Sequence, residues 1–231
     1  MQNDYYLDDN SLGPDFYPKI SEKYDFLNHF LSFNLDIGWR RKVPGLIDLS
    51  KGNKVLDACT GTGDLALEIT RQLPEVELTG IDICSDMLKI AEAKFVKAGL
   101  NDRISLITAD LRKLPFPDQN FDYVTAAFGI RNVPQVEKAL GEMERVTKKG
   151  GKVIVLELSM PQSRVFKALY LMYLKYWIPL IGGLISGKFS AYRFLSQSIQ
   201  LFSQKAPEYF KGWMVYPLSQ GIASIYLREL R

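Results

Sequence analysis

The sequence contains little cysteine and histidine. Among its 231 residues there are two cysteines, Cys59 and Cys84, and one histidine, His29. Two cysteines cannot form the disulfide framework of a small secreted domain, and one histidine excludes metal sites that need several His and Cys ligands. We therefore expect no metal centre, and we expect a reducing, cytoplasmic location.

The chain also lacks an excess of charge of one sign. It carries 29 Lys and Arg against 26 Asp and Glu, a net charge of +3, with no long basic run. The densest basic cluster, Arg40-Arg41-Lys42, is typical of a solvated helix face. Nucleic-acid-binding domains present a strongly basic face, so we expect no nucleic-acid partner.

No apolar run in the chain is both long and uninterrupted. A membrane-spanning helix needs roughly 18 or more apolar residues in a row, whereas Lys175 and Pro179 interrupt the most apolar stretch, residues 169–189. The first twenty residues contain four aspartates and no apolar run after a basic start, so a secretory signal is not expected. We interpret residues 169–189 as a helical lobe that is buried or that touches the inner face of a membrane peripherally.

The sequence does contain an alternation of strand and helix patterns. Apolar, β-branched runs predict strands, and helical patterns separate them. The strands are expected at 54–59, 76–82, 103–110, 121–128 and 151–159, and the helices at 64–73, 86–98 and 134–146. Buried parallel strands are nearly continuous apolar runs, and strands that alternate with helices form a sheet covered on both faces. The pattern predicts an α/β fold with a doubly wound, mostly parallel sheet.

Two further regions flank the predicted sheet. Residues 1–50 are rich in aromatic residues and helical in pattern, and the chain after residue 160 is helical through about Phe202. The runs 214–218 and 222–227 are joined by a short link, which favours an antiparallel hairpin at a sheet edge. No repeat or linker divides the chain. We therefore expect a single domain with a helical cap at 1–50, a sheet core at 51–160, and a lid with the closing hairpin at 161–231.

A glycine-containing turn follows the first predicted strand. The strand ends at Asp57, and the segment Cys59-Thr60-Gly61-Thr62-Gly63 leads directly into a helix. Glycines allow the backbone to turn tightly and to approach a ligand, and a helix N-terminus presents free N–H groups. About twenty residues later the second strand ends at Asp82, where a carboxylate can accept both hydroxyls of a ribose. These residues predict a nucleoside-binding site, and Gly61-x-Gly63-x-x-Ala66 leaves NAD open as an alternative ligand.

The third and fourth predicted strands end in further candidate residues. Asp110 can hold an adenine amine while Leu111 packs against the ring, although Asp110 alone is also typical of a turn cap. A cofactor whose adenosine lies over strands one to three has its reactive end near the end of strand four, at Ala127 and the segment 128–134.

Several motifs together resemble one family. They are D-x-C-T-G-T-G-D at 57–64, L-P-F-P-D at 114–118, F-G-I-R-N-V at 128–133, L-E-L-S-M-P at 156–161, and K-Y-D-F-L-N at 23–28. This combination is similar to the quinone C-methyltransferases of ubiquinone and menaquinone biosynthesis, with F-G-I-R-N-V the most specific part. The similarity covers about residues 16–202 and resumes at the closing hairpin.

The resemblance implies a seven-stranded class I methyltransferase fold with S-adenosylmethionine as the cofactor. It implies methylation of a ring carbon of a prenylated hydroquinone, either demethylmenaquinol or a polyprenyl-methoxy-benzoquinol, with a homodimer or a quinone-biosynthesis complex as further options. The family's cofactor contacts fall on Thr62, Asp82, Asp110 with Leu111, and Ala127, where the family often has serine. Two other readings stay open: a methyltransferase for another lipid or small molecule, and a non-catalytic scaffold that binds the cofactor.

The expected chemistry assigns roles to four more residues. A quinol carbon attacks better once an adjacent hydroxyl has ionised, and the positive charge of Arg131 can stabilise that oxyanion while Asn132 orients it. The alternative is that Arg131 pairs with Asp25 and holds the N-terminal region. The resemblance also implies that Tyr24 and Asp25 belong to the active site, whereas His29 is expected to serve packing.

The C-terminal third is expected to receive the substrate tail. Residues 169–185, with Y-R-F-L-x-x-S-I at 192–199, form a predicted lid whose apolar residues fit a prenyl groove or contact with a bilayer. Between Phe202 and Trp213 the chain has only a short segment where the family usually has a longer helix, which affects the expected tail preference and not the cofactor site.

Overall fold

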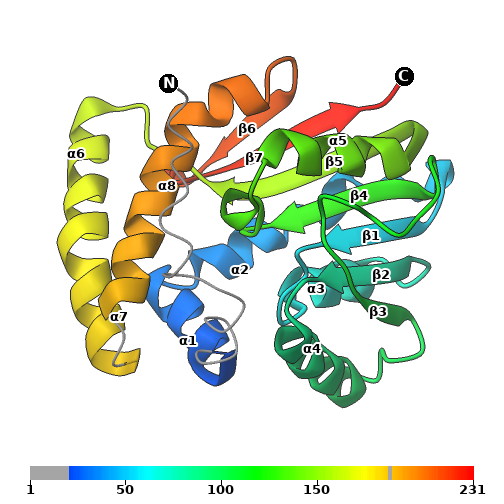
Figure 1. Cartoon of the computed structure of the whole chain (residues 1–231), viewed down its shortest axis with the longest axis horizontal. Coiled ribbons are helices and arrows are strands. Elements are labelled where there is room, and N and C mark those ends of the chain that lie inside the picture. Colours follow the sequence, from blue (N-terminus) through cyan, green and yellow to red (C-terminus); the bar gives the residue numbers. More distant parts are fainter. Residues whose placement is uncertain (1–20, 187–188) are drawn as a thin grey trace.

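The computed structural model describes residues 21–186 and 189–231, without the side chains of residues 21–24, 51, 186, 190 and 191. Its centre is a seven-stranded sheet in the order β3-β2-β1-β4-β5-β7-β6 (Figure 1). The strands are β1 Lys54–Ala58, β2 Glu77–Asp82, β3 Ile104–Thr108, β4 Phe121–Ala127, β5 Thr147–Leu158, β6 Met214–Leu218 and β7 Ala223–Glu229. The predicted fold class is confirmed.

Strand direction follows the predicted pattern. The first five strands run parallel to one another, whereas β7 is antiparallel to both β5 and β6. The hairpin of β6 and β7 turns through a short 3₁₀ segment, Ser219–Gly221, and ends the sheet at one edge. β1 and β4 lie in the middle of the sheet, which explains their nearly continuous apolar sequences.

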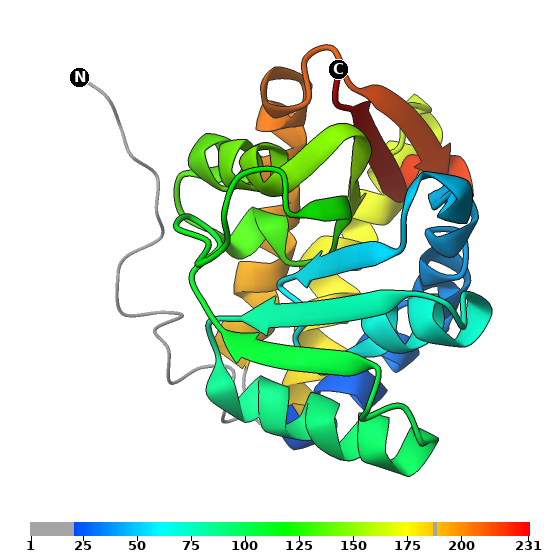
Figure 2. The ribbon, with the colours of Figure 1, turned by 90° about the vertical axis from the view of Figure 1, so that its right-hand side faces the viewer.

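Helices cover both faces of the sheet, as Figure 2 shows. The elements on one face are α2 Leu35–Arg40, α3 Asp64–Gln72 and α4 Ser85–Ala98; on the other they are α5 Val136–Val146 and the end of α8 Phe189–Tyr209. Side chains of β1 alternate between the two cores: Val55 packs with the first group, and Leu56 packs with the second. The carboxyl ends of the parallel strands stay free of these helices, which leaves an edge for a site.

A third hydrophobic cluster lies beside the sheet. It joins α1 Ser21–Leu31 to a helical hairpin made of α6 Arg164–Met172, a π-helical turn Tyr173–Trp177, α7 Ile178–Ser186 and α8. Figure 1 shows this lobe at the left of the sheet, with α1 between the hairpin and the strands. The stretch Arg164–Ile185 is long and apolar enough, by length and composition, to cross a membrane, but one side of it packs against α8 and α1.

The structure differs from the prediction at α8. The sequence suggested a helix that ends near Phe202, whereas α8 continues to Tyr209 and contains Pro207. Phe202, Ala206 and Phe210 are spaced four residues apart and pack together against the sheet. This burial maintains the helix through a residue that usually ends one. The prediction that the helix ends near Phe202 was therefore wrong.

Candidate functional site

A pocket lies at the carboxyl ends of β1, β2 and β4. Its walls are the glycine turn after β1, the acid at the end of β2 and the turn after β4. The lining residues are Arg40, Asp57, Cys59, Thr60, Gly61, Thr62, Asp64, Leu65, Asp82, Ile83, Met87, Ala127, Phe128, Gly129, Asn132 and Val133. Of the predicted site residues, Asp57, Gly61, Thr62, Asp82, Ala127 and Asn132 thus line one pocket.

The two glycines of the turn have different tasks. Both have positive φ, 56° at Gly61 and 83° at Gly63. A Cβ at Gly63 would lie 2.5 Å from the ring of Phe95, so Gly63 lets α3 pack against α4 and does not itself line the pocket. A Cβ at Gly61 would meet nothing closer than 4.0 Å, so the backbone of Gly61 faces open space. Gly61 therefore leaves space beside its backbone that a ligand could occupy.

Asp82 closes the turn from the end of β2. One carboxylate oxygen accepts the backbone N–H of Gly61 and the other accepts that of Cys84, each at 2.9 Å. Burial raises the pKa of Asp82, against the effect of these hydrogen bonds. Each carboxylate oxygen can accept more than one hydrogen bond, so Asp82 keeps acceptor capacity for hydroxyl groups in the pocket.

Asp57 braces the turn from within. It is 1% exposed, and its two oxygens accept hydrogen bonds from the hydroxyls of Thr60 at 2.7 Å and Thr125 at 2.8 Å. Burial raises the pKa of Asp57 to about 6, although both hydrogen bonds act to lower it. Asp57 therefore holds the turn in shape while forming part of the pocket wall.

Asp110 and Leu111 are not brought into this pocket lining. The Asp110 carboxylate binds Arg112, which donates from Nη2 at 2.7 Å and from Nε at 3.0 Å. These hydrogen bonds hold the pKa of Asp110 below its usual range. Leu111 is buried in the core beneath α5. Both residues follow β3 as predicted, but the structure gives their side chains protein partners.

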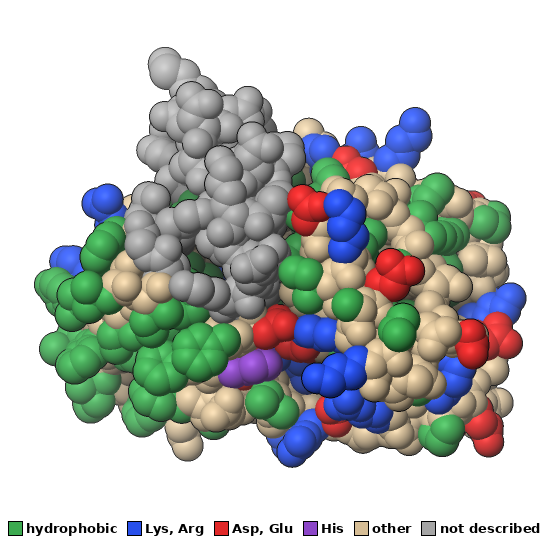
Figure 3. Space-filling model, turned by 90° about the horizontal axis from the view of Figure 1, so that it is seen from below, with side chains coloured by type: hydrophobic (Ala, Val, Ile, Leu, Met, Phe, Trp, Pro, Cys, Tyr) green, Lys and Arg blue, Asp and Glu red, His purple; other side chains and the backbone are tan. Residues whose placement is uncertain are grey.

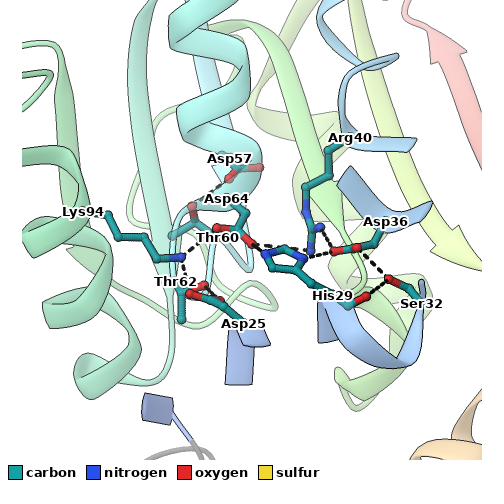
Figure 4. A network of polar contacts seen from close by, with 10 residues as sticks. All are labelled: Asp25, His29, Ser32, Asp36, Arg40, Asp57, Thr60, Thr62, Asp64 and Lys94. Carbon is teal, nitrogen blue, oxygen red and sulfur yellow. Dashed lines mark hydrogen bonds and ion pairs between the residues drawn. The ribbon is translucent and has the colours of Figure 1, made fainter. Parts of the chain in front are cut away.

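Contacts from the N-terminal helix fix α1 against the glycine turn (Figure 4). Asp25 accepts a hydrogen bond from the Thr62 hydroxyl at 2.5 Å and pairs with Lys94 of α4. Lys94 also binds Asp64, at the start of α3, at 2.7 Å. The predicted alternative that Asp25 pairs with Arg131 was therefore wrong. Tyr24 lies in the same helix, but its side chain is outside the described part of the structure.

Arg131 instead forms a buried pair with Glu157. Its Nη1 donates to Glu157 Oε1 at 2.5 Å and to the carbonyl of Phe128 at 2.6 Å. The two side chains are 6% and 0% exposed. Arg131 therefore lies behind the pocket wall formed by Phe128 and Asn132, with its charge balanced by an acid from the L-E-L-S-M-P motif. Sequence reasoning did not identify Glu157 as the partner.

Sequence reasoning also missed the residues at the entrance of the pocket. Arg40 lines the pocket, pairs with Asp36, and places its guanidinium 4.9 Å from the ring centroid of Phe128. His29 joins this network, with Nδ1 2.8 Å from Asp36 and Nε2 3.7 Å from Asp64 (Figure 4). The reading of Arg40 as part of a solvated face was wrong. The signal available was the spacing of Asp36 and Arg40, four residues apart on one helix face.

Charges within this network support one another. Burial alone would raise the pKa of Asp36, but Arg40 and a hydrogen bond from Ser32 hold that pKa below its usual value. Asp36 thus presents a negative charge that fixes Arg40 at the pocket wall and orients His29.

Known proteins share this sequence and fold. The model of the ubiE/COQ5 methyltransferase family matches residues 8–214. A demethylmenaquinone methyltransferase of Thermotoga maritima is 46% identical over 221 residues, covering 93% of this chain and 94% of its own. One from Thermus thermophilus is 42% identical, covering 92% and 99%. A solved SAM-dependent methyltransferase of Aquifex aeolicus shares the fold, with a TM-score of 0.58 at 19% identity over 92% of this chain and 97% of its own.

The matched region contains the glycine turn, Asp82 and the strand-four motif that together form the pocket. The chain therefore belongs to the ubiE/COQ5 methyltransferase family.

Proposed function

We propose that this protein transfers a methyl group from S-adenosylmethionine to a ring carbon of a prenylated hydroquinone, with demethylmenaquinol as the first candidate. The protein is a methyltransferase by its family, and its relatives of 42–46% identity from Thermus and Thermotoga are named for demethylmenaquinone. The observation that carries the proposal is the pocket in which Asp82 and the open backbone of Gly61 meet the strand-four motif. An NAD-dependent activity has no comparable support.

The residues of the pocket fit the cofactor. Asp82 has acceptor capacity for the ribose hydroxyls, Gly61 leaves room beside its backbone, and Ile83 and Met87 offer apolar walls for a nucleoside. Ala127 and Thr62 line the same pocket and are proposed as further contacts. S-adenosylmethionine supplies a methyl group that is already activated by a positively charged sulfur. Contact of Asp110 and Leu111 with adenine would require the turn after β3 to rearrange.

The remaining task of the protein is to orient the quinol and to favour its ionised oxygen. Asn132 lines the pocket and is proposed to hold that oxygen. Arg131, directly behind it, is proposed as a positioning residue whose positive charge stabilises the oxyanion from behind the wall. Asp25 is proposed to act through Thr62 and Lys94 by holding α1 over the turn, and Tyr24 remains proposed as a site residue from the same helix.

The role of Arg131 predicts a change in the pH profile of turnover. The double variant Arg131→Gln with Glu157→Gln removes both buried charges, so neither is left unpaired. We expect kcat near neutral pH to fall about tenfold or more, and its rising limb to move to higher pH, because the quinol ionises less readily without the cation. The measurement is kcat from pH 6 to 9.

The single variant Glu157→Gln is the control, because it retains the Arg131 charge. In this variant, the rise of kcat with pH is expected at the same pH as in the unmodified protein or at a lower pH. A double variant that binds cofactor normally and keeps the original pH profile would exclude this role for Arg131.

The function itself is tested by direct transfer. Purified protein is incubated with methyl-labelled S-adenosylmethionine and, separately, with reduced demethylmenaquinol and reduced polyprenyl-methoxy-benzoquinol, and the extracted lipid is examined by mass spectrometry. We expect one methyl group on a ring carbon of demethylmenaquinol. An Asp82→Asn protein, prepared in parallel, controls for contaminating activity. Transfer to neither quinol, despite cofactor binding, would reject the proposal and favour another substrate or a scaffold role.

We also propose that the helical lobe rests on a membrane surface, where prenylated quinols reside. Exposed apolar side chains gather over α6, α7 and the end of α1, as Figure 3 shows at one end of the molecule. Between Glu157 and Glu208 the chain has no acidic residue and has six basic ones: Arg164, Lys167, Lys175, Lys188, Arg193 and Lys205. Apolar and aromatic side chains flanked by basic ones are the pattern of a helix that lies in the interface of an anionic bilayer.

A further inference from the structure

A second cavity lies between the sheet and the helical lobe. It has a volume of about 290 Å³ and is formed by the turn between α1 and α2, the ends of β5 and β7, and the helices α6 and α8. Its lining residues are Leu31, Ser32, Phe33, Leu35, Trp39, Leu158, Phe166, Leu169, Tyr170, Tyr173, Ile178, Leu195, Ile199 and Ile222. Arg131, Asn132 and Asp25, the predicted catalytic residues whose side chains the structure describes, do not line this cavity.

The cavity offers almost no polar group to a ligand. The indole N–H of Trp39 donates to Ser219 at 2.8 Å, and the hydroxyl of Tyr173 donates to the carbonyl of Leu31 at 2.6 Å. The hydroxyl of Ser32 donates to Asp36 at 2.6 Å. Because these polar groups have protein partners, the space that remains is lined by hydrocarbon and aromatic rings. Its chemistry suits a hydrocarbon ligand.

The cavity lies directly behind the reaction pocket. The ring of Trp39 lies on the cavity side and the ring of Phe128 on the pocket side, with their centroids 6.1 Å apart. Arg131 donates to the carbonyl of Phe128, which lines the reaction pocket, and pairs with Glu157. Glu157 directly precedes Leu158, which lines the cavity, so this buried pair links the walls of the two cavities.

The far side of the cavity meets the exposed apolar face of the lobe. Phe33 and Leu169 line the cavity and are 75% and 58% exposed. Phe166, which also lines it, is 42% exposed. A long hydrocarbon chain in this cavity could thus have one end near the strand-four turn and continue over the apolar surface of α6.

We propose that this cavity binds the first isoprene units of the substrate's tail, with the quinol ring held at the partition beside Asn132. The assignment rests on the proposed function for the identity of the tail. In this arrangement the methyl donor lies at the glycine turn, the ring lies beside Asn132, and the tail runs through the second cavity toward the exposed face of the lobe. The tail fixes the ring by apolar burial, while the polar groups of the first pocket act on the ring oxygen.

The test narrows the cavity and compares two substrates. Leu195→Trp fills the cavity from α8, and Leu201→Trp makes the same change at a 39% exposed position of the same helix outside the cavity lining. The substrates are demethylmenaquinols with one and with four isoprene units. For the four-unit quinol we expect Leu195→Trp to raise KM about tenfold or more with little change in kcat, because several buried methylene contacts are lost. The single-unit quinol should show a much smaller increase, and Leu201→Trp none.

A binding measurement separates the cavity from the reaction. The affinity of each variant for menaquinone with four isoprene units, the methylated product, is measured by equilibrium dialysis in detergent, and thermal unfolding shows whether each variant is folded. Weaker binding to folded Leu195→Trp alone supports the tail site, even if the unmodified protein methylates neither quinol and the proposed function fails. Equal affinity of both variants and the unmodified protein, or KM values that rise equally for both tails, would overturn the assignment.

Discussion

Asp57 shows how one buried carboxylate makes folding sensitive to pH. Its folded pKa of about 6 lies above the ordinary aspartate pKa of 3.8, so the folded chain binds a proton more tightly than the unfolded chain. The contribution to stability is fully present below about pH 4 and is lost as the pH rises through about 6. The shift corresponds to about 3 kcal/mol of unfolding free energy. At neutral pH the ionised carboxylate therefore lowers the free energy of unfolding, but it also accepts the two hydroxyl hydrogen bonds that hold the glycine turn in shape.

Replacement of Asp57 by asparagine should remove this pH dependence. Between pH 4 and pH 7, the unfolding free energy of Asp57→Asn is expected to improve by about 2 kcal/mol relative to the unmodified protein, whatever the absolute cost of the changed hydrogen bonds. Urea unfolding at several pH values measures it.

A second variant acts on the same carboxylate. Thr125→Val removes a hydrogen bond that lowers the folded pKa of Asp57, so the loss of stability should still begin near pH 4 but continue to higher pH than in the unmodified protein. Parallel pH curves for the unmodified protein and Asp57→Asn would show that Asp57 does not titrate differently on folding.

At the scale of elements, the turn from β1 into α3 depends on a glycine that no other residue can replace without strain. We expect Gly63→Ala to lower the unfolding free energy by about 2–4 kcal/mol, from its positive φ and from the contact of the new methyl group with Phe95. Gly141→Ala is the matched control, because Gly141 lies in α5 with nothing within 4 Å of an added Cβ. That change should raise stability by about 0.5–1 kcal/mol.

Chemical denaturation of Gly63→Ala and Gly141→Ala measures both changes in the free energy of unfolding. Phe95→Leu added to Gly63→Ala should restore the part of the loss that comes from crowding, and not the part that comes from φ. If Gly63→Ala were as stable as Gly141→Ala, this would contradict the claim that a side chain at position 63 is excluded by the close packing of α3 against α4.

The elements also show what the sequence could and could not reveal. Continuous apolar runs and helix periodicity predicted the sheet and the hairpin, because both patterns are local. The glycine turn and Asp82 could be predicted because a strand that ends in a turn places its next residues at a known edge. Arg131 and Glu157 are 26 residues apart, and their pairing depends on how β4 and β5 lie together. Helix α8 exceeded its prediction because tertiary burial outweighed the local effect of Pro207.

At the scale of the whole molecule, the apolar surface of the lobe and the pocket at the edge of the sheet lie on different parts of the chain. Figure 1 shows the lobe of α6, α7 and α8 at the left of the sheet and α4 at the bottom, beside β3. The exposed side chains of the lobe include Leu169, Trp177 and Leu184. Such an apolar surface is larger than isolated exposed residues explain and indicates a binding surface. The proposed membrane contact therefore falls on the lobe, and the proposed methyl transfer falls at the edge of the sheet.

This separation predicts selective binding to anionic vesicles. The protein should float with vesicles of phosphatidylcholine and phosphatidylglycerol and much less with phosphatidylcholine alone, and salt should weaken the binding. Lys167→Glu with Lys175→Glu, both exposed on the lobe, should reduce the affinity about tenfold or more.

The control makes the same charge change away from the lobe. Lys97→Glu with Lys113→Glu, at exposed positions on α4 and after β3, should leave vesicle binding nearly unchanged. An equal effect of the two double variants would point to net charge as the cause and would contradict a membrane-binding lobe.

The turn after α1 and the helix α2 contribute to both cavities, because Ser32 of the turn lines the apolar one, Arg40 of α2 lines the reaction pocket, and both bind Asp36. A ligand that ordered this shared wall from one cavity would lower the entropic cost of binding in the other cavity. Methyl donor and lipid would then each raise the affinity of the other by the same factor. Asp36 is the carboxylate through which such a coupling would run.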